Sequence, residues 1–153
     1  MTKFIIIGSL KIPNEHRESK LVENKESFSS SHSSNVSSGC SITSTFKGKD
    51  IVIAVKGEID LDSSVDVYRR IWTEIDNGEH GLVLDLEELD FMDSSGLQIL
   101  LRLKEKLSNV DKKILISNPS NQIMKLFQLT GFDKLFNIYN SNDEALLRLN
   151  DKT

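Results

Sequence analysis

Several kinds of residue are scarce in this sequence, and each scarcity excludes a class of protein. The 153 residues include one cysteine, Cys40, so the chain can form neither an internal disulfide nor a cysteine-based metal centre. No apolar run approaches the ~18 residues of a membrane span. The short apolar start, Phe4 to Ile7, lacks the length of a secretory signal. We therefore expect a cytoplasmic protein with no membrane partner.

Positive charge is not in excess either. The chain carries 19 Lys and Arg residues against 23 Asp and Glu residues, which gives a formal net charge of -4. Proteins that bind nucleic acids or anionic lipids do so through basic patches. We therefore expect no nucleic-acid partner. The length favours one domain with a sizeable core.

The first part of the chain differs in composition from the rest. The stretch from Ser27 to Ser38 is mostly serine and has few apolar residues. Such a segment buries too little apolar surface to offset the entropy lost on ordering. The sequence therefore predicts a flexible Ser-rich N-terminal tail over residues 1–41 and one folded domain over residues 42–150.

The folded part begins with two predicted strands and a helix. Ile51, Ile53 and Val55 alternate as in a strand, after a tight turn at residues 47–49. Apolar residues then recur at helical spacing and predict one buried helix face: Leu61, Val65, Tyr68, Trp72 and Ile75.

The rest of the chain alternates strands with helices. Strands are predicted at residues 82–86, 112–117 and 135–139, and helices at 94–109, after Pro119, and after Ser141. This order predicts an α/β fold with a mixed, mostly parallel central sheet and about four helices. Sites in such sheets lie beyond the carboxyl ends of the strands. Residues 57–60 and 87–94 are expected there.

Catalysis is not favoured by the residues present. A nucleophilic serine needs a base within reach, and of the three histidines only His80 falls in the predicted domain, about 17 Å from the serines across a five-residue strand. Asp60, Asp90 and Asp93 could hold Mg²⁺, but a helix cap and solvated loop positions explain them better. We therefore expect no enzyme activity, no metal and no cofactor.

Asp93–Ser94–Ser95–Gly96, taken alone, predicts only a helix cap. It stands, however, in FMDSSGL (91–97), together with GEID (57–60) and LFQLTGFDKLF (126–136). With these segments, residues 42–150 resemble the STAS-domain anti-sigma-factor antagonists of bacterial partner switching. One departure is Gln98, where family members commonly have a small residue.

The resemblance implies a function and a set of site residues. It implies phosphorylation of Ser94, with Ser95 as the alternative, by an anti-sigma-factor serine kinase, and resetting by a serine phosphatase. The unphosphorylated form would bind the kinase and free the sigma factor. The implied partner-binding residues are Asp60, Asp93, Ser94, Ser95 and Gly96. Two other STAS roles stay open: a scaffold subunit of a stress-sensing complex and an accessory subunit of a membrane transporter.

Overall fold

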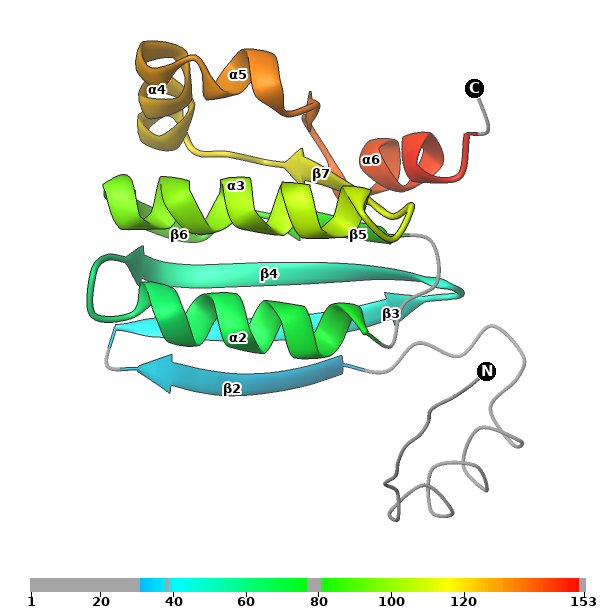
Figure 1. The fold of residues 1–153 in the computed structure, drawn as a ribbon, viewed down its shortest axis with the longest axis horizontal. Coiled ribbons are helices and arrows are strands. Elements are labelled where there is room, and N and C mark those ends of the chain that lie inside the picture. Colours follow the sequence, from blue (N-terminus) through cyan, green and yellow to red (C-terminus); the bar gives the residue numbers. More distant parts are fainter. Residues whose placement is uncertain (1–30, 38, 77–80, 152–153) are drawn as a thin grey trace.

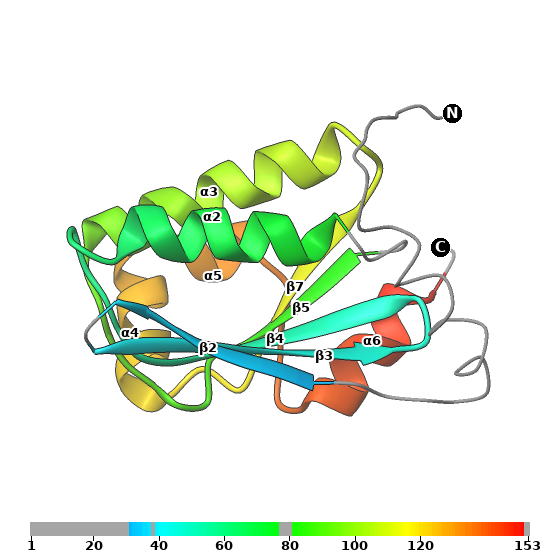
Figure 2. The same cartoon turned by 90° about the horizontal axis from the view of Figure 1, so that it is seen from below.

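A mixed sheet with helices on both faces forms the centre of the molecule (Figures 1 and 2). The structure is a computed structural model that describes residues 31–37, 39–76 and 81–151. Its elements are, in chain order, β2 Ser31–Ser37, β3 Cys40–Lys47, β4 Asp50–Ile59, α2 Ser64–Ile75, β5 Gly81–Asp85, β6 Leu89–Met92, α3 Ser94–Ser108, β7 Lys113–Ser117, α4 Asn121–Thr130, α5 Phe132–Leu135, β8 Ile138–Tyr139 and α6 Asn142–Leu149.

The sheet has seven strands in the order β2-β3-β4-β5-β7-β8, and β6 pairs with β4. β2, β3 and β4 are antiparallel neighbours, whereas the other pairs are parallel. β4 is long enough to serve two partners along one side: residues 51–54 pair with β5, and residues 57–59 pair with β6. The predicted α/β class with a mostly parallel sheet is confirmed.

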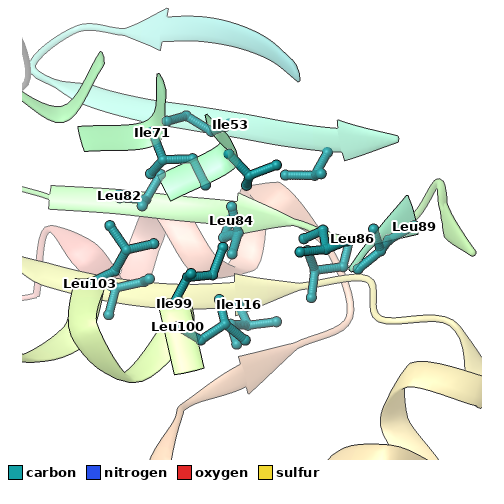
Figure 3. Packing of buried hydrophobic residues seen from close by; sticks show 14 of the residues in the cluster. Ile53, Ile71, Leu82, Leu84, Leu86, Leu89, Ile99, Leu100, Leu103 and Ile116 are labelled. Atoms are coloured by element: carbon teal, nitrogen blue, oxygen red, sulfur yellow. The ribbon is translucent and has the colours of Figure 1, made fainter. Parts of the chain in front are cut away.

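Two hydrophobic clusters hold the layers together. The larger lies between the sheet and helices α2 and α3, where Ile53, Leu84 and Ile116 of three neighbouring strands meet Ile71 and Leu100 (Figure 3). A smaller cluster lies under α6 on the opposite face of the sheet. The strands β4, β5 and β7 therefore carry apolar residues at both parities, as strands covered on both sides do. Among the described helices, none has the length and apolarity to cross a bilayer.

The predicted tail is wrong at its C-terminal end. Residues 31–37 form strand β2, and β3 already begins at Cys40. Backbone pairing with β3 holds β2, together with hydroxyl contacts such as that from Thr43 Oγ1 to Ser33 Oγ at 3.2 Å. Arg70 of α2 also donates to the Ser34 hydroxyl. Composition missed this strand because backbone pairing and hydroxyl contacts hold it, and these leave no apolar pattern in the sequence. Residues 1–30 of the predicted tail lie outside the described residues.

The predicted buried face of α2 is wrong at its N-terminal end. Leu61 and Val65 are 75% and 55% exposed, while the buried residues of the helix are Ser64, Val67, Ile71 and Ile75. The buried face has the same helical spacing as the predicted one but is rotated about the helix axis. Ser64 lies at its start, and this polar residue interrupts the apolar pattern in the sequence. Tyr68 and Trp72 are half-buried at the margin of the core. Two smaller differences are the extra strand β6 and the short helix α5, which takes up Leu135 at the start of the predicted strand 135–139.

Candidate functional site

The N-terminus of α3 is capped by Asp93, as its position before the helix predicts. Asp93 has an extended backbone, and its Oδ1 atom accepts hydrogen bonds from the N–H groups of Ser95 at 2.8 Å and Gly96 at 3.3 Å. The Ser95 hydroxyl donates to the same oxygen. One carboxylate oxygen thus satisfies two backbone donors that the helix itself leaves unpaired.

These hydrogen bonds also fix the charge of Asp93. The hydrogen bond from the Ser95 hydroxyl lowers the pKa of the Asp93 carboxyl below its usual value, and the N–H groups of Gly96, Ser95 and Leu61 lower it further. Partial burial acts in the opposite direction but is the weaker effect. Asp93 is therefore a carboxylate at neutral pH and places a negative charge beside the two serines.

The two adjacent serines differ in their surroundings. The Ser95 side chain is half-buried, and its hydroxyl is taken up by Asp93. Ser94 is exposed, and its hydroxyl makes no hydrogen bond to any residue that the structure describes. Of the two serine hydroxyls, that of Ser94 is therefore the more accessible from solution.

Asp60 is used in shaping the entry to α2. It follows β4 directly, and its Oδ1 atom accepts hydrogen bonds from the N–H and the hydroxyl of Ser63, each at 3.0 Å. The N–H of Asp60 in turn donates to the Ser63 hydroxyl at 2.9 Å. The Asp60 side chain is half-buried at this end of the sheet.

The structure brings the Asp60 and Asp93 segments together. Ile59 of β4 pairs with Met92 of β6, and the N–H of Asp93 donates to the Ile59 carbonyl at 3.1 Å. Figure 1 shows the N-terminal ends of α2 and α3 side by side where β4 ends. The predicted edge therefore carries Asp60, Asp93, Ser94 and Ser95, as expected from the topology.

Gly96 has a packing role. It is buried, and a Cβ atom there would lie 2.4 Å from Met92 Cγ and 3.1 Å from Ile59 Cγ2. The absence of a side chain lets α3 approach β4 and β6 closely. Contact between Gly96 and a partner stays a prediction.

The site is a surface and not a cavity. Two shallow hollows, of about 210 and 330 Å³, lie elsewhere, and neither is lined by Ser94 or Ser95. Asp90 lines the larger hollow and does not join Asp60 and Asp93. Among the described residues, no three His, Cys, Asp or Glu side chains gather as metal ligands do. His80 lies outside the described residues.

Two residues at this edge, Leu61 and Val65, have the spacing of core residues in the sequence but are exposed in the structure. Leu61 immediately follows Asp60, and Val65 lies in the first turn of α2. Exposed apolar side chains beside a predicted site are typical of protein-binding surfaces. Ser63 and Ser64 are buried, which leaves Leu61 and Val65 on the exposed side of this segment. The serine pair between these two apolar residues is the feature of the sequence that indicates this arrangement.

These features describe an α/β domain with an exposed serine at the end of its sheet. The serine begins a helix that an aspartate caps, and a second aspartate lies in the neighbouring segment. A family model for the STAS domain matches residues 41–145, so the chain belongs to the STAS-domain family. The chain is 27% identical over 97 residues to the anti-sigma-B factor antagonist of Staphylococcus aureus, covering 63% of this chain and 90% of that protein.

Two solved structures are similar to this chain over about two thirds or more of its length. An anti-sigma factor antagonist from Mycobacterium paratuberculosis superposes with a TM-score of 0.68 at 26% identity, covering 77% of this chain and 100% of that chain. The Bacillus cell fate determinant SpoIIAA in its phosphorylated form gives a TM-score of 0.52 at 28% identity, covering 66% of this chain and 91% of that chain. Both similarities extend over most of the neighbour's length.

Proposed function

We propose that this protein is an anti-sigma-factor antagonist switched by phosphorylation of Ser94. The unphosphorylated form binds an anti-sigma-factor serine kinase and thereby frees the sigma factor, and a serine phosphatase restores this form after phosphorylation. The observation that carries the proposal is the exposed, unbonded Ser94 hydroxyl next to the capping carboxylate. The names of the relatives support it, and one structural neighbour is a phosphorylated antagonist.

The contacts favour Ser94 over Ser95 as the acceptor of the phosphate. The hydroxyl of Ser95 already donates to Asp93, and a phosphate on it would replace that hydrogen bond by repulsion between two anions. Ser94 has no such bond to lose. A phosphate on Ser94 also lies at a helix N-terminus, which stabilises anions by about 0.3–1 kcal/mol at an exposed site. The fold therefore tolerates the modification.

The effect on binding follows from charge and size. A phosphate adds a charge of about -1.5 to -2 at neutral pH, next to the carboxylates of Asp93 and Asp60. A partner surface fitted to a small hydroxyl then meets both repulsion and a steric clash. A change of about 2.7 kcal/mol is enough for a hundredfold loss of affinity. In this cycle the chain is a binding partner and a substrate, and the kinase and phosphatase supply the chemistry.

The test uses the full chain with purified anti-sigma-factor serine kinases of the source organism, ATP and Mg²⁺. We expect one phosphate, on Ser94, located by fragmentation of the peptide that carries both serines. Ser94→Ala should block phosphorylation and still bind, whereas Ser94→Asp should remain folded and bind much more weakly. Ser95→Ala should still be phosphorylated. Ser108→Ala, an exposed serine at the other end of α3, is the matched control.

Two results would contradict the proposal. Phosphate on Ser95 alone would move the switch by one residue. Tight binding by Ser94→Asp would show that charge at this position does not exclude the partner. Size-exclusion chromatography separates the scaffold alternative, because a scaffold subunit would elute in a very large particle.

A further inference from the structure

Strand β2 lies before the part of the chain that the STAS family model matches. The match begins at residue 41, whereas β2 spans Ser31–Ser37 at the edge of the sheet. In Figure 1, the end of β2 and the beginning of β3 lie at the same end of the molecule as the start of α2. β2 is therefore an addition to the matched domain, and its C-terminal end lies near the candidate site.

Gly39, which directly precedes β3, contacts the segment that leads to Asp60. Beyond the last pair between β3 and β4, the N–H of Glu58 donates to the Gly39 carbonyl at 3.0 Å. On the other side of β4, the N–H of Gly57 donates to the Glu88 carbonyl, also at 3.0 Å. The end of β4 is thus held from both sides just before Asp60.

The contact between Gly39 and β4 leaves no room for a side chain. A Cβ atom on Gly57 would lie 1.9 Å from the Gly39 carbonyl oxygen, and Gly57 has a φ of 100°, which favours glycine. Gly39 itself borders open space. Among the described residues, nothing beyond its chain neighbours lies within 4 Å of a Cβ atom built there, and together with Asn35 it lines the hollow of about 330 Å³. Backbone contacts, and not packed side chains, therefore keep Gly39 against β4.

Arg70 of α2 holds β2 from the helix side. Its guanidinium donates to the Ser34 hydroxyl and to Glu74 Oε1, the latter at 2.8 Å. Glu74 in turn accepts from the hydroxyl of the buried Ser44 of β3 at 3.1 Å. The Arg70 and Glu74 side chains are 29% and 13% exposed, so salt screens this pair less than a fully exposed one. β2 is therefore fastened both to β3 and to α2.

These contacts connect β2 with Asp60 by two routes. The first is the backbone route through Gly39 and Glu58. The second runs along α2 from Arg70 to the helix start, where Asp60 Oδ1 accepts the N–H of Ser63 at 3.0 Å. Opening of β2 interrupts both routes, and β6 alone then pairs with the last residues of β4. Such local opening needs less free energy than unfolding of the whole domain.

We propose that β2 and Gly39 brace the Asp60 segment, so that the N-terminal part of the chain regulates partner binding through β2. This inference rests on the proposed function and adds a second regulation of the same site, independent of Ser94. Loosening β2 leaves every proposed contact residue in place, but the Asp60 segment must then be ordered when the partner binds. Ordering the backbone of one residue lowers affinity by about tenfold.

Hydrogen exchange of the full chain, followed residue by residue by NMR, tests the brace without any partner. In Arg70→Ala, the N–H of Glu58 should exchange about fivefold faster or more than in the wild type, because β2 and Gly39 open more often. The N–H of Gly57 is the internal control, since it is bonded on the β6 side, and it should exchange at the wild-type rate. Arg69→Ala is the matched variant, because Arg69 pairs with the exposed Asp66 at 2.8 Å and should change neither rate.

Binding of the full chain to each purified anti-sigma-factor kinase of the source organism is measured by calorimetry. Arg70→Ala and Gly57→Ala should each weaken binding to the cognate kinase by about tenfold. Arg69→Ala and Gly48→Ala should bind as the wild type does. Gly48 is matched to Gly57, because it also has a positive φ, 64°, but lies in the turn at the other end of β4, where a Cβ atom meets nothing within 4 Å. Arg70→Ala decides the test if Gly57→Ala does not fold.

The outcomes separate this inference from the proposed function. If Glu58 exchanges at the wild-type rate in Arg70→Ala, the brace is wrong, whatever the kinases do. If Arg70→Ala binds like the wild type, or Arg69→Ala binds as weakly as Arg70→Ala, while Ser94→Asp still loses binding, then β2 does not regulate the site and the switch stands. If no kinase binds or phosphorylates the wild type, the proposed function fails and regulation of partner binding fails with it, even where exchange confirms the brace.

Discussion

Asp93 offers the sharpest test of how the site is built, because one oxygen of its carboxylate accepts three hydrogen bonds. Replacement by alanine removes the cap of α3, which is worth about 0.5–2 kcal/mol. It also leaves the Ser95 hydroxyl to find another acceptor, at a further cost of up to about 1 kcal/mol. We therefore expect Asp93→Ala to lower the free energy of unfolding by about 0.5–3 kcal/mol.

Asparagine at this position separates the charge from the cap. Asn caps helices about as well as Asp, so Asp93→Asn should cost less than about 1 kcal/mol at neutral pH. The pKa of Asp93 is lower in the folded state than in the unfolded state, where it is about 3.9. The carboxylate charge therefore stabilises the fold at pH values above about 3.9. This stabilisation is lost as the pH falls through the folded-state pKa. The stability difference between wild type and Asp93→Asn should therefore shrink below about pH 4.

Urea unfolding followed by circular dichroism at pH 7 and at pH 3 measures both effects. Asp62→Ala is a suitable control, because Asp62 is an exposed acid of the neighbouring loop and should change stability by less than about 0.5 kcal/mol. A loss below about 0.5 kcal/mol for Asp93→Ala would show that the cap does not form. If the free energies of unfolding of the wild type and Asp93→Asn differ by the same amount at both pH values, the pKa of Asp93 is not lowered in the folded state.

Two further predictions concern stability. A chain that begins at Ser41 lacks β2 and the contact between Arg70 and Ser34. Its free energy of unfolding should therefore be about 1–2 kcal/mol lower than that of a chain that begins at Ser31, whereas a flexible tail over residues 1–41 would predict no difference. Equal urea midpoints for the two chains would contradict this prediction. Trp72→Ala should lower the free energy of unfolding by about 1.5–3 kcal/mol, because Trp72 is half-buried under Lys106. Removing a fully buried aromatic residue costs about 3–5 kcal/mol. A loss above about 4 kcal/mol, measured by thermal unfolding, would show that Trp72 is more deeply buried.

The sequence predicted those parts of the fold in which pattern and burial agree. The alternation of Ile51, Ile53 and Val55 and the apolar run at residues 82–86 became β4 and β5, because strands covered by helices need apolar side chains. Gly131 ends α4 in the left-handed region at φ 84°, and Ser141 caps α6. Such end signals are read reliably because each satisfies backbone groups that the helix leaves unpaired.

Prediction failed where polar contacts or small residues replaced apolar burial. The serines of β2 predict a flexible segment, because composition does not reveal the hydroxyl and Arg70 contacts that hold this strand. The buried face of α2 was misplaced because Ser63 and Ser64 occupy interior positions. The sequence predicts the helix cap at Asp93. It does not predict that the Ser95 hydroxyl is hydrogen-bonded while the Ser94 hydroxyl is not, because this depends on which hydroxyl can reach the Asp93 carboxylate.

The double pairing of β4 has a consequence for the rate of association. β4 holds β5 along one stretch and β6 along the next, and its last carbonyl accepts the N–H of Asp93. The segments that carry Asp60 and Ser94 are thus tied to a strand in the middle of the sheet, so they have little conformational freedom to lose in an encounter. Preorganised surfaces avoid that entropic penalty and form complexes without a slow rearrangement step. Under the function proposed above, the rate of the switch would then be set by the modifying enzymes and by diffusion of the partner.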